Sequence, residues 1–164
     1  MTAISRTQVG IVGAGPAGLL LSPLLALRGI DSIVVENRSR AYCEARQRAG
    51  LLEAGTVELL RKVGLGARMD AEGLEHGGIY LQFAGQRRHV VVRALCGRTV
   101  TVYAQTEVVK DLIAARLAAG ARIEFEVKRD PGRADNEIAR ACRASTFSVR
   151  KARARLGLRL GGDV

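Results

Sequence analysis

Three glycines at fixed spacing, Gly13, Gly15 and Gly18, constrain the fold of this chain more than any other feature. They follow a short apolar run over residues 8–12, which has the length and composition of a buried parallel strand. Pro16 stands where the first position of a helix is expected, because the amide hydrogen that proline lacks has no partner there. The spacing therefore predicts a strand, a tight glycine turn and a helix.

A second strand over 32–35 completes this unit, after a predicted helix over 16–28. A glycine turn before a helix lets a pyrophosphate approach the backbone, and the helix N-terminus supplies free N–H groups. A carboxylate at the end of the second strand can bind ribose hydroxyls. The alternative is a glycine turn that binds nothing. We expect a dinucleotide site made by Gly13, Gly15, Pro16, Ala17, Gly18 and Glu36.

The remaining pattern up to residue 127 predicts further helices and strands. They are a helix over 50–63, an antiparallel hairpin of 79–83 and 89–93, a strand over 99–103, a helix over 106–117 capped by Thr106, and a third parallel strand over 121–127. Pro23 lies inside the first predicted helix and should bend it. The fold class is therefore α/β, a partial doubly wound Rossmann-like domain with an inserted antiparallel β-hairpin, and residues 1–127 are its expected, incomplete extent.

Residues 128–164 differ from the rest. The chain carries a net charge of +10, and this segment holds 10 basic and 4 acidic side chains against 16 and 12 before it. It lacks strand alternation and helical periodicity, so we expect a basic tail that is disordered or derived from a shifted reading frame. Such a tail can bind nucleic acid without specificity. An aromatic content of 4% without Trp argues against a stacking surface for single strands.

Cysteine spacing and hydropathy argue against a disulfide-rich, a metal-binding or a membrane-spanning protein. Cys43, Cys96 and Cys142 lie far apart and form no C-x-x-C pair, so neither a disulfide framework nor a metal site is expected. The longest apolar stretch, 18–27, is too short to cross a bilayer. A cytoplasmic protein with no membrane partner is the expectation.

Arg46 and Arg48 stand two residues apart in a segment rich in small residues. In an extended segment their side chains point to opposite sides, so one could reach a phosphate while the other faces a second anion. The alternative is a solvated basic loop, the usual environment of exposed arginines.

Several segments together resemble the single-component FAD-dependent aromatic-ring monooxygenases, and among them the branch that hydroxylates 4-hydroxybenzoate. They are the glycine motif, Glu36, and the segments 46–50, 83–88 and 99–107, within residues 7–127. The resemblance implies an oxidoreductase with FAD as cofactor and NADPH or NADH as co-substrate. It would insert one oxygen atom of O2 beside the phenol of a small phenolic acid, giving 3,4-dihydroxybenzoate. It also implies a homodimer for full-length members.

The resemblance assigns residues by position: Arg46, Arg48 and Gln105 to FAD, and Arg38, Tyr42 and Arg48 to NAD(P)H. It implies that His76 is the outer end of a proton relay, a role that the neutral pKa range of histidine suits. The alternative for His76 is a surface loop residue beside two glycines. Asn37 and Arg38 depart from the family pattern where the nicotinamide nucleotide is chosen, which leaves NADPH and NADH open.

The sequence contains no counterpart of the family segments that complete the flavin site and clasp the phenolic acid. The primary interpretation is therefore an inactive or incomplete fragment of the monooxygenase. One alternative is a non-catalytic FAD- or dinucleotide-binding module completed by another chain. A less favoured alternative is a basic nucleic-acid-binding protein.

Overall fold

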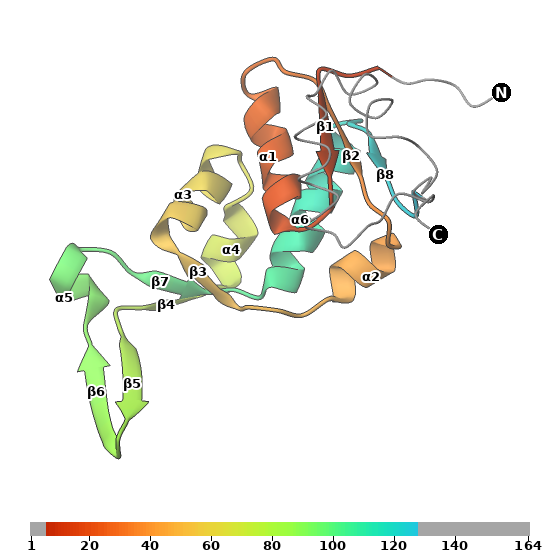
Figure 1. Cartoon of the computed structure of the whole chain (residues 1–164). Helices are drawn as coiled ribbons and strands as arrows, with labels where there is room; N and C mark the ends of the chain where they lie inside the picture. Colours follow the sequence, from red (N-terminus) through yellow and green to blue (C-terminus); the bar gives the residue numbers. More distant parts are fainter. Residues whose placement is uncertain (1–5, 128–164) are drawn as a thin grey trace, which may run out of the picture. The chain divides into compact units, whose positions relative to one another are not determined.

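The computed structural model describes residues 6–127. Backbone contacts divide the chain into two units, Met1–Glu126 and Val127–Val164. The expectation of a basic tail over 128–164 lies outside the described residues. Figure 1 shows the arrangement of the helices and strands.

A parallel sheet and two long helices beside it form one part of the unit (Figure 1). Strands β1 (Val9–Val12), β2 (Ser32–Val35) and β8 (Ile123–Glu124) pair in the order β1-β2-β8. Helix α1 (Pro16–Ala26) connects β1 to β2 and packs against α6 (Gln105–Ala118), which leads into β8. The predicted β-α-β unit and the third parallel strand are confirmed, although the last strand is shorter than expected.

The core lies where α1 and α6 cover the sheet. Leu19, Val34, Leu112 and Ile113 are at most 2% exposed and belong to one buried cluster. Full burial of each such side chain contributes about 1.5–3 kcal/mol to folding. Among the described residues β1 pairs on one side only, and Val12 at its end is 84% exposed. Within this part of the chain, the other side of β1 is therefore an unpaired sheet edge.

The helix predicted over 50–63 is partly wrong, because its first residues form a strand of a second, antiparallel sheet. Strand β3 (Leu51–Glu53) and strand β4 (Leu74–His76) flank β7 (Val100–Val102) in the order β3-β7-β4. Only Ala54–Lys62 are helical, as α3. The helical spacing of the leucines was misleading because residues 51–53 gain their backbone partners from a strand about fifty positions away.

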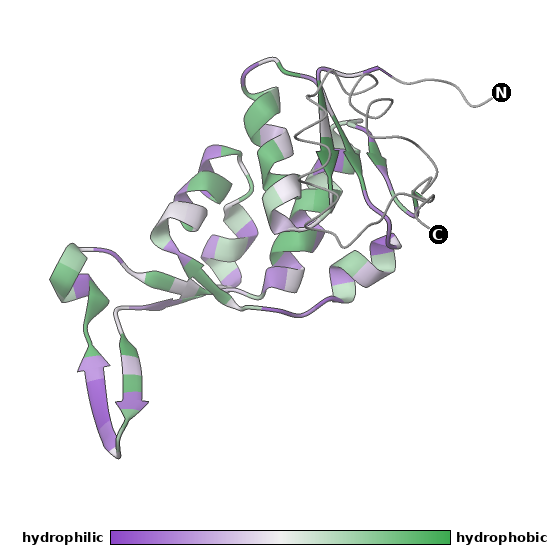
Figure 2. Cartoon of the chain, viewed as in Figure 1, coloured by the Kyte–Doolittle hydropathy of each residue, from purple (hydrophilic) through white to green (hydrophobic). Residues whose placement is uncertain are grey.

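The predicted hairpin is present with a shifted second strand. Strands β5 (Ile79–Phe83) and β6 (Gln86–Val90) join through Ala84 and Gly85, whose φ angles of 47° and 72° form a two-residue turn. The expected second strand over 89–93 is wrong by three residues, and Val92–Cys96 form the short helix α5. All of β5 is exposed, and Figure 2 shows apolar and polar bands along it.

Besides α5, two more short helices of the described residues were not predicted. Helix α2 (Arg40–Ala45) follows β2, and helix α4 (Ala67–Glu72) precedes β4. Helix α6 starts one residue earlier than predicted, with Ala104 rather than Thr106 at its N-cap. Within residues 6–127, no helix has the length and apolar character needed to cross a membrane.

An ion-pair network fastens α4 to α6. Arg68 of α4 donates to the carboxylates of Glu107 and Asp111, and the second distance is 2.7 Å. The buried hydroxyl of Tyr103 donates to Asp111 at 2.7 Å. Glu107 in the first turn of α6 and Asp111 in the next turn therefore both bind an arginine of another helix.

Candidate dinucleotide-binding site

The glycine turn is held by β2. Gly13 adopts a φ of 110°, which side-chain-bearing residues rarely do, and its N–H donates to the carbonyl of Val35 at 2.8 Å. This bond places the turn at the carboxyl ends of β1 and β2. Open α/β sheets bind ligands at this edge.

Gly18 and Gly15 lie in the same turn but have different surroundings, which are tightly packed at Gly18 and open at Gly15. A Cβ atom on Gly18 would lie 2.2 Å from the carbonyl oxygen of Gly13, so the close packing of helix and turn leaves no room for a side chain. A Cβ atom on Gly15 would meet no heavy atom within 4 Å. Gly15 also has an ordinary φ of −80°. Its surroundings are therefore open space rather than packed protein.

The N-terminus of α1 is uncapped. Gly15 is the N-cap residue, no side chain bonds the end of the helix, and its first turn carries no acidic residue. Within residues 6–127, no hydrogen-bond acceptor is recorded for the N–H groups of Ala17 and Gly18. Free donors and the positive end of the helix dipole suit a phosphate group.

Glu36 points back at this turn from the end of β2. One carboxylate oxygen accepts the N–H of Ala14 at 2.8 Å, and the other accepts the N–H of Arg38 at 2.9 Å. Each carboxylate oxygen can accept a further hydrogen bond. Glu36 is partly buried, so it can hold the loop and still face a ligand.

A basic and aromatic cluster lies on α2. The guanidinium groups of Arg38 and Arg46 lie 5.3 Å and 5.6 Å from the ring centre of Tyr42, within cation–π range. The side chain of Ser39 caps α2 by accepting the N–H of Tyr42 at 3.2 Å. The structure thus brings together three of the residues assigned to cofactor and nucleotide, Arg38, Tyr42 and Arg46.

Gln105 joins the loop that carries Arg48. The N–H of Gln105 donates to the carbonyl of Ala49 at 3.0 Å, and its side-chain oxygen faces the N–H of Ala49 at 3.4 Å. Arg48 itself is exposed. The start of α6 and the arginine segment, far apart in the sequence, are therefore neighbours.

His76 lies in a different part of the unit. It is the last residue of β4, not part of a loop, and it is exposed. It lines a cavity of about 590 Å³ together with residues of β5, β6 and β7, among them His89, Tyr80 and Val100. None of the described residues that line this cavity belongs to the glycine turn.

The sequence interpretation missed three contributors to the site. Ser39 is a good N-cap residue ahead of a short helical segment, and that signal could have revealed α2. The backbone of Ala14 binds Glu36, which no residue pattern announces. Cys43 is the buried residue of α2, and burial above all, and then the charge of Glu36, raise the pKa of its thiol. These residues position the site without being exposed to a ligand.

Comparison with known proteins identifies relatives by sequence. Residues 6–146 match the profile of a protein family described as FAD binding domain. A stretch of 116 residues is 48% identical to the p-hydroxybenzoate hydroxylase of Acinetobacter baylyi. This stretch covers 70% of the present chain and 29% of the hydroxylase, so the chain spans less than a third of that relative.

Solved structures share the fold. A probable FAD-dependent monooxygenase from Pseudomonas aeruginosa superposes with a TM-score of 0.64 at 20% identity, over 77% of this chain and 36% of that one. The p-nitrophenol 4-monooxygenase of Pseudomonas putida gives a TM-score of 0.62 at 20% identity, over 76% and 34%. The predicted partial Rossmann-like α/β fold is thereby confirmed.

Proposed function

The chain belongs to the FAD binding domain family, and on this premise we propose that it forms the FAD-binding part of an aromatic monooxygenase. The enzyme would convert 4-hydroxybenzoate to 3,4-dihydroxybenzoate with NAD(P)H and O2. The observation that carries this proposal is the carboxylate of Glu36 bound to Ala14 beside an uncapped helix N-terminus. The 48% identity to a p-hydroxybenzoate hydroxylase supports the substrate.

The residues of the turn fit the pyrophosphate of FAD. Ala17 and Gly18 offer free N–H donors, and the space beside Gly15 is open enough for a phosphate to approach the backbone. Glu36 retains lone pairs for the hydroxyls of a ribose. This combination of donors, open space and acceptor distinguishes a dinucleotide site from an ordinary glycine turn.

Arg46, Arg48 and Gln105 are proposed to extend the contact along FAD. Gln105 fixes the arginine segment through Ala49, so the two exposed guanidinium groups leave the same anchored loop. Arginine suits phosphate because its planar group presents several donors at once. FAD, when bound, supplies the redox and oxygen chemistry, and this chain holds and orients it.

The NAD(P)H contact is proposed to involve Arg38, Tyr42 and Arg48. Arg38 stands two residues after Glu36, and its guanidinium lies over the exposed ring of Tyr42. A guanidinium at this place can bind a phosphate and a ring can stack on a flat heterocycle. His76 is proposed to exchange a proton between solvent and the substrate phenol, which its exposed position at the end of β4 permits.

A titration of the 164-residue chain with FAD tests the cofactor proposal. The natural chain should bind FAD saturably, seen as a change in flavin fluorescence and visible absorbance. Gly15→Val should abolish binding while the chain stays folded, because the added side chain occupies the phosphate space and its Cβ meets no protein atom within 4 Å. Gly55→Val is the matched control, since Gly55 also has open surroundings but lies in α3.

Two outcomes would contradict the proposal. One is a folded natural chain that shows no FAD binding. The other is equal binding by Gly15→Val and Gly55→Val, which would place the flavin away from the glycine turn. Far-UV circular dichroism of each variant shows whether a loss of binding reflects the site or the fold.

A further inference from the structure

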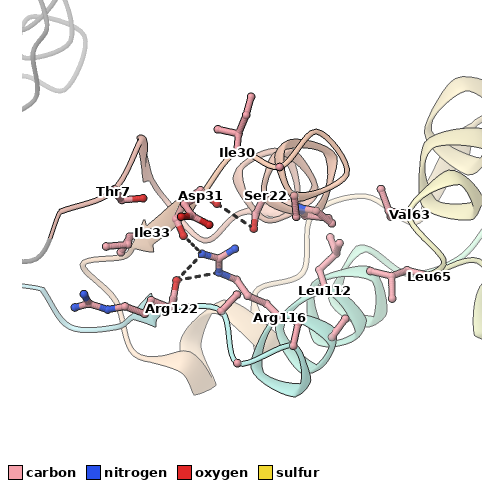
Figure 3. A pocket seen from close by; sticks show the side chains of 18 of the residues that line it. Thr7, Ser22, Ile30, Asp31, Ile33, Val63, Leu65, Leu112, Arg116 and Arg122 are labelled. Carbon is pink, nitrogen blue, oxygen red and sulfur yellow. Dashed lines mark hydrogen bonds between the residues drawn. The ribbon is translucent and has the colours of Figure 1, made fainter.

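A cavity of about 580 Å³ lies at the end of the parallel sheet where its strands begin. Figure 3 shows the residues that line it. The starts of β1, β2 and β8 and the last turns of α1 and α6 surround it. Nothing in the FAD proposal uses this cavity, because that site lies at the carboxyl ends of the same strands.

Arg116 is the buried charge of this cavity. Its side chain belongs to a residue that is 7% exposed. Nε donates to the carbonyl of Arg122 at 2.9 Å, and Nη2 donates to that carbonyl and to the carbonyl of Ser32 at 2.6 Å and 2.7 Å. Within residues 6–127, Nη1 has no recorded acceptor and no carboxylate lies within ion-pair distance of the guanidinium. The group therefore keeps unused donor capacity.

The charge of Arg116 is poorly compensated. Burial lowers the pKa of its guanidinium, which shows the cost of removing this cation from water. Three bonds to neutral carbonyls reduce that cost but supply no counter-charge. Asp31 is the acid among the described lining residues and makes no ion pair with Arg116, while Arg6 adds positive charge at the rim and Arg122 is paired with Glu124. An anion is the missing complement.

The cavity around the guanidinium has a polar part and an apolar part. Ser22 is 3% exposed and its hydroxyl lies 3.4 Å from that of Ser32, so a second polar group is buried in the same cavity. Leu65, Leu112 and the ring of Pro23 line it as well. Figure 3 shows Ser22 and Arg116 near one another, with Leu112 and Leu65 along the neighbouring wall.

Pro23 places an apolar ring in the wall of the cavity, although a proline is unfavourable inside a helix. A proline inside α1 removes one backbone hydrogen bond and is costly there. Its ring replaces a polar N–H with apolar surface directly after the buried Ser22. The polar end and the apolar wall of the cavity therefore meet on consecutive residues of one helix.

From this arrangement we infer a second binding site, in which Arg116 and Ser22 hold the carboxylate of a small apolar monocarboxylic acid and Leu65, Leu112 and Pro23 contact its hydrocarbon part. A carboxylate accepts hydrogen bonds from a guanidinium and a hydroxyl together, and it supplies the missing counter-charge. The volume of about 580 Å³ lies in the range of small-molecule sites. The site is separate from FAD and needs no cofactor.

Heteronuclear NMR of the 15N-labelled 164-residue chain tests this inference with two probes. Cyclohexanecarboxylate carries the required anion, and cyclohexylmethanol is its neutral counterpart of similar shape. The carboxylate should shift the Nε–H signal of Arg116 and the amide signal of Ser32 saturably, and bind at least about tenfold more tightly than the alcohol. The amide signals of Ala17 and Gly18, in the FAD site, should not move.

Matched leucine substitutions locate the site. Ala115→Leu places a larger side chain in the cavity and should weaken carboxylate binding at least about tenfold. Ala114→Leu makes the same change on the exposed neighbouring position, outside the cavity, and should leave binding unchanged. Arg116→Met should remove the preference for the carboxylate over the alcohol.

Three results would overturn the inference: no saturable shift below about 10 mM carboxylate, equal affinity for the two probes, or equal effects of Ala115→Leu and Ala114→Leu. If Arg116→Met does not fold, the two leucine variants decide the question alone. Circular dichroism of each variant identifies such a failure.

Discussion

Glu36 accepts a hydrogen bond from the backbone N–H of Ala14 at 2.8 Å, across 22 positions of sequence. The bond connects the end of β2 to the turn that follows β1. It fixes the carboxylate beside the free N-terminus of α1, so an acceptor for hydroxyls and donors for phosphates face the same space. The geometry thus prepares the binding of a dinucleotide before one arrives.

Replacing Glu36 with alanine should weaken FAD binding more than it weakens the fold. The variant loses the ribose acceptor and the anchor of the turn, and hydrogen bonds to a charged group contribute about 1.5–3 kcal/mol each. The dissociation constant should therefore rise at least about tenfold. Fluorescence titration with FAD measures it.

Glu58→Ala provides the control for this prediction, because Glu58 is an exposed carboxylate of α3. It should bind FAD like the natural chain. Equal affinities for the Glu36 and Glu58 variants would show that the carboxylate of Glu36 has no part in binding.

Gly18→Ala and Gly15→Ala should differ in stability. A Cβ on Gly18 would approach the carbonyl oxygen of Gly13 to 2.2 Å, so the helix must move away from the turn. Overpacking of this kind costs about 1–3 kcal/mol. Gly15→Ala meets no atom within 4 Å and should cost less than about 0.5 kcal/mol. Urea unfolding of both variants measures the difference, and a smaller cost at Gly18 would contradict the packing described here.

Tyr103 should make stability decline in alkaline solution. Its burial, and then its hydrogen bond to Asp111, raise the pKa of the phenol above its usual value of 10.0. The unfolded chain therefore loses this proton at a lower pH than the folded chain, and the free energy of unfolding falls as the pH rises above about 10. Urea unfolding between pH 8 and about 11 should show a steeper decline for the natural chain than for Tyr103→Phe. Identical slopes would mean that the folded state does not perturb this phenol.

Local patterns were sufficient where a structure depends on neighbouring residues. The glycine spacing and Pro16 predicted β1, the turn and α1, because turn geometry and helix starts depend on a few adjacent positions. Leu51–Glu53 illustrate the opposite case. Their leucines have helical spacing, but pairing with Val100–Val102 makes them a strand. A partner so distant in sequence leaves no local signal.

The candidate site likewise combines features that local sequence patterns predict with features that depend on residues far apart in the sequence. Glu36 could be located from its distance to the glycines, and the structure places it at the turn. The proximity of Gln105 to the arginine segment depends on the hydrogen bonds between Gln105 and Ala49, which no spacing reveals. The cavity around Arg116 was also invisible in the sequence, since α1, α6 and three strand ends build it.

The central claim is that the free N–H groups at the start of α1 bind the pyrophosphate of FAD. The most direct measurement is an FAD titration of the labelled chain followed by backbone amide NMR. Saturable shifts are expected at Ala17 and Gly18, with no comparable shift at Thr56 in the first turn of α3. Shifts of equal size at Thr56, or none at Ala17 and Gly18 while FAD binds, would contradict it.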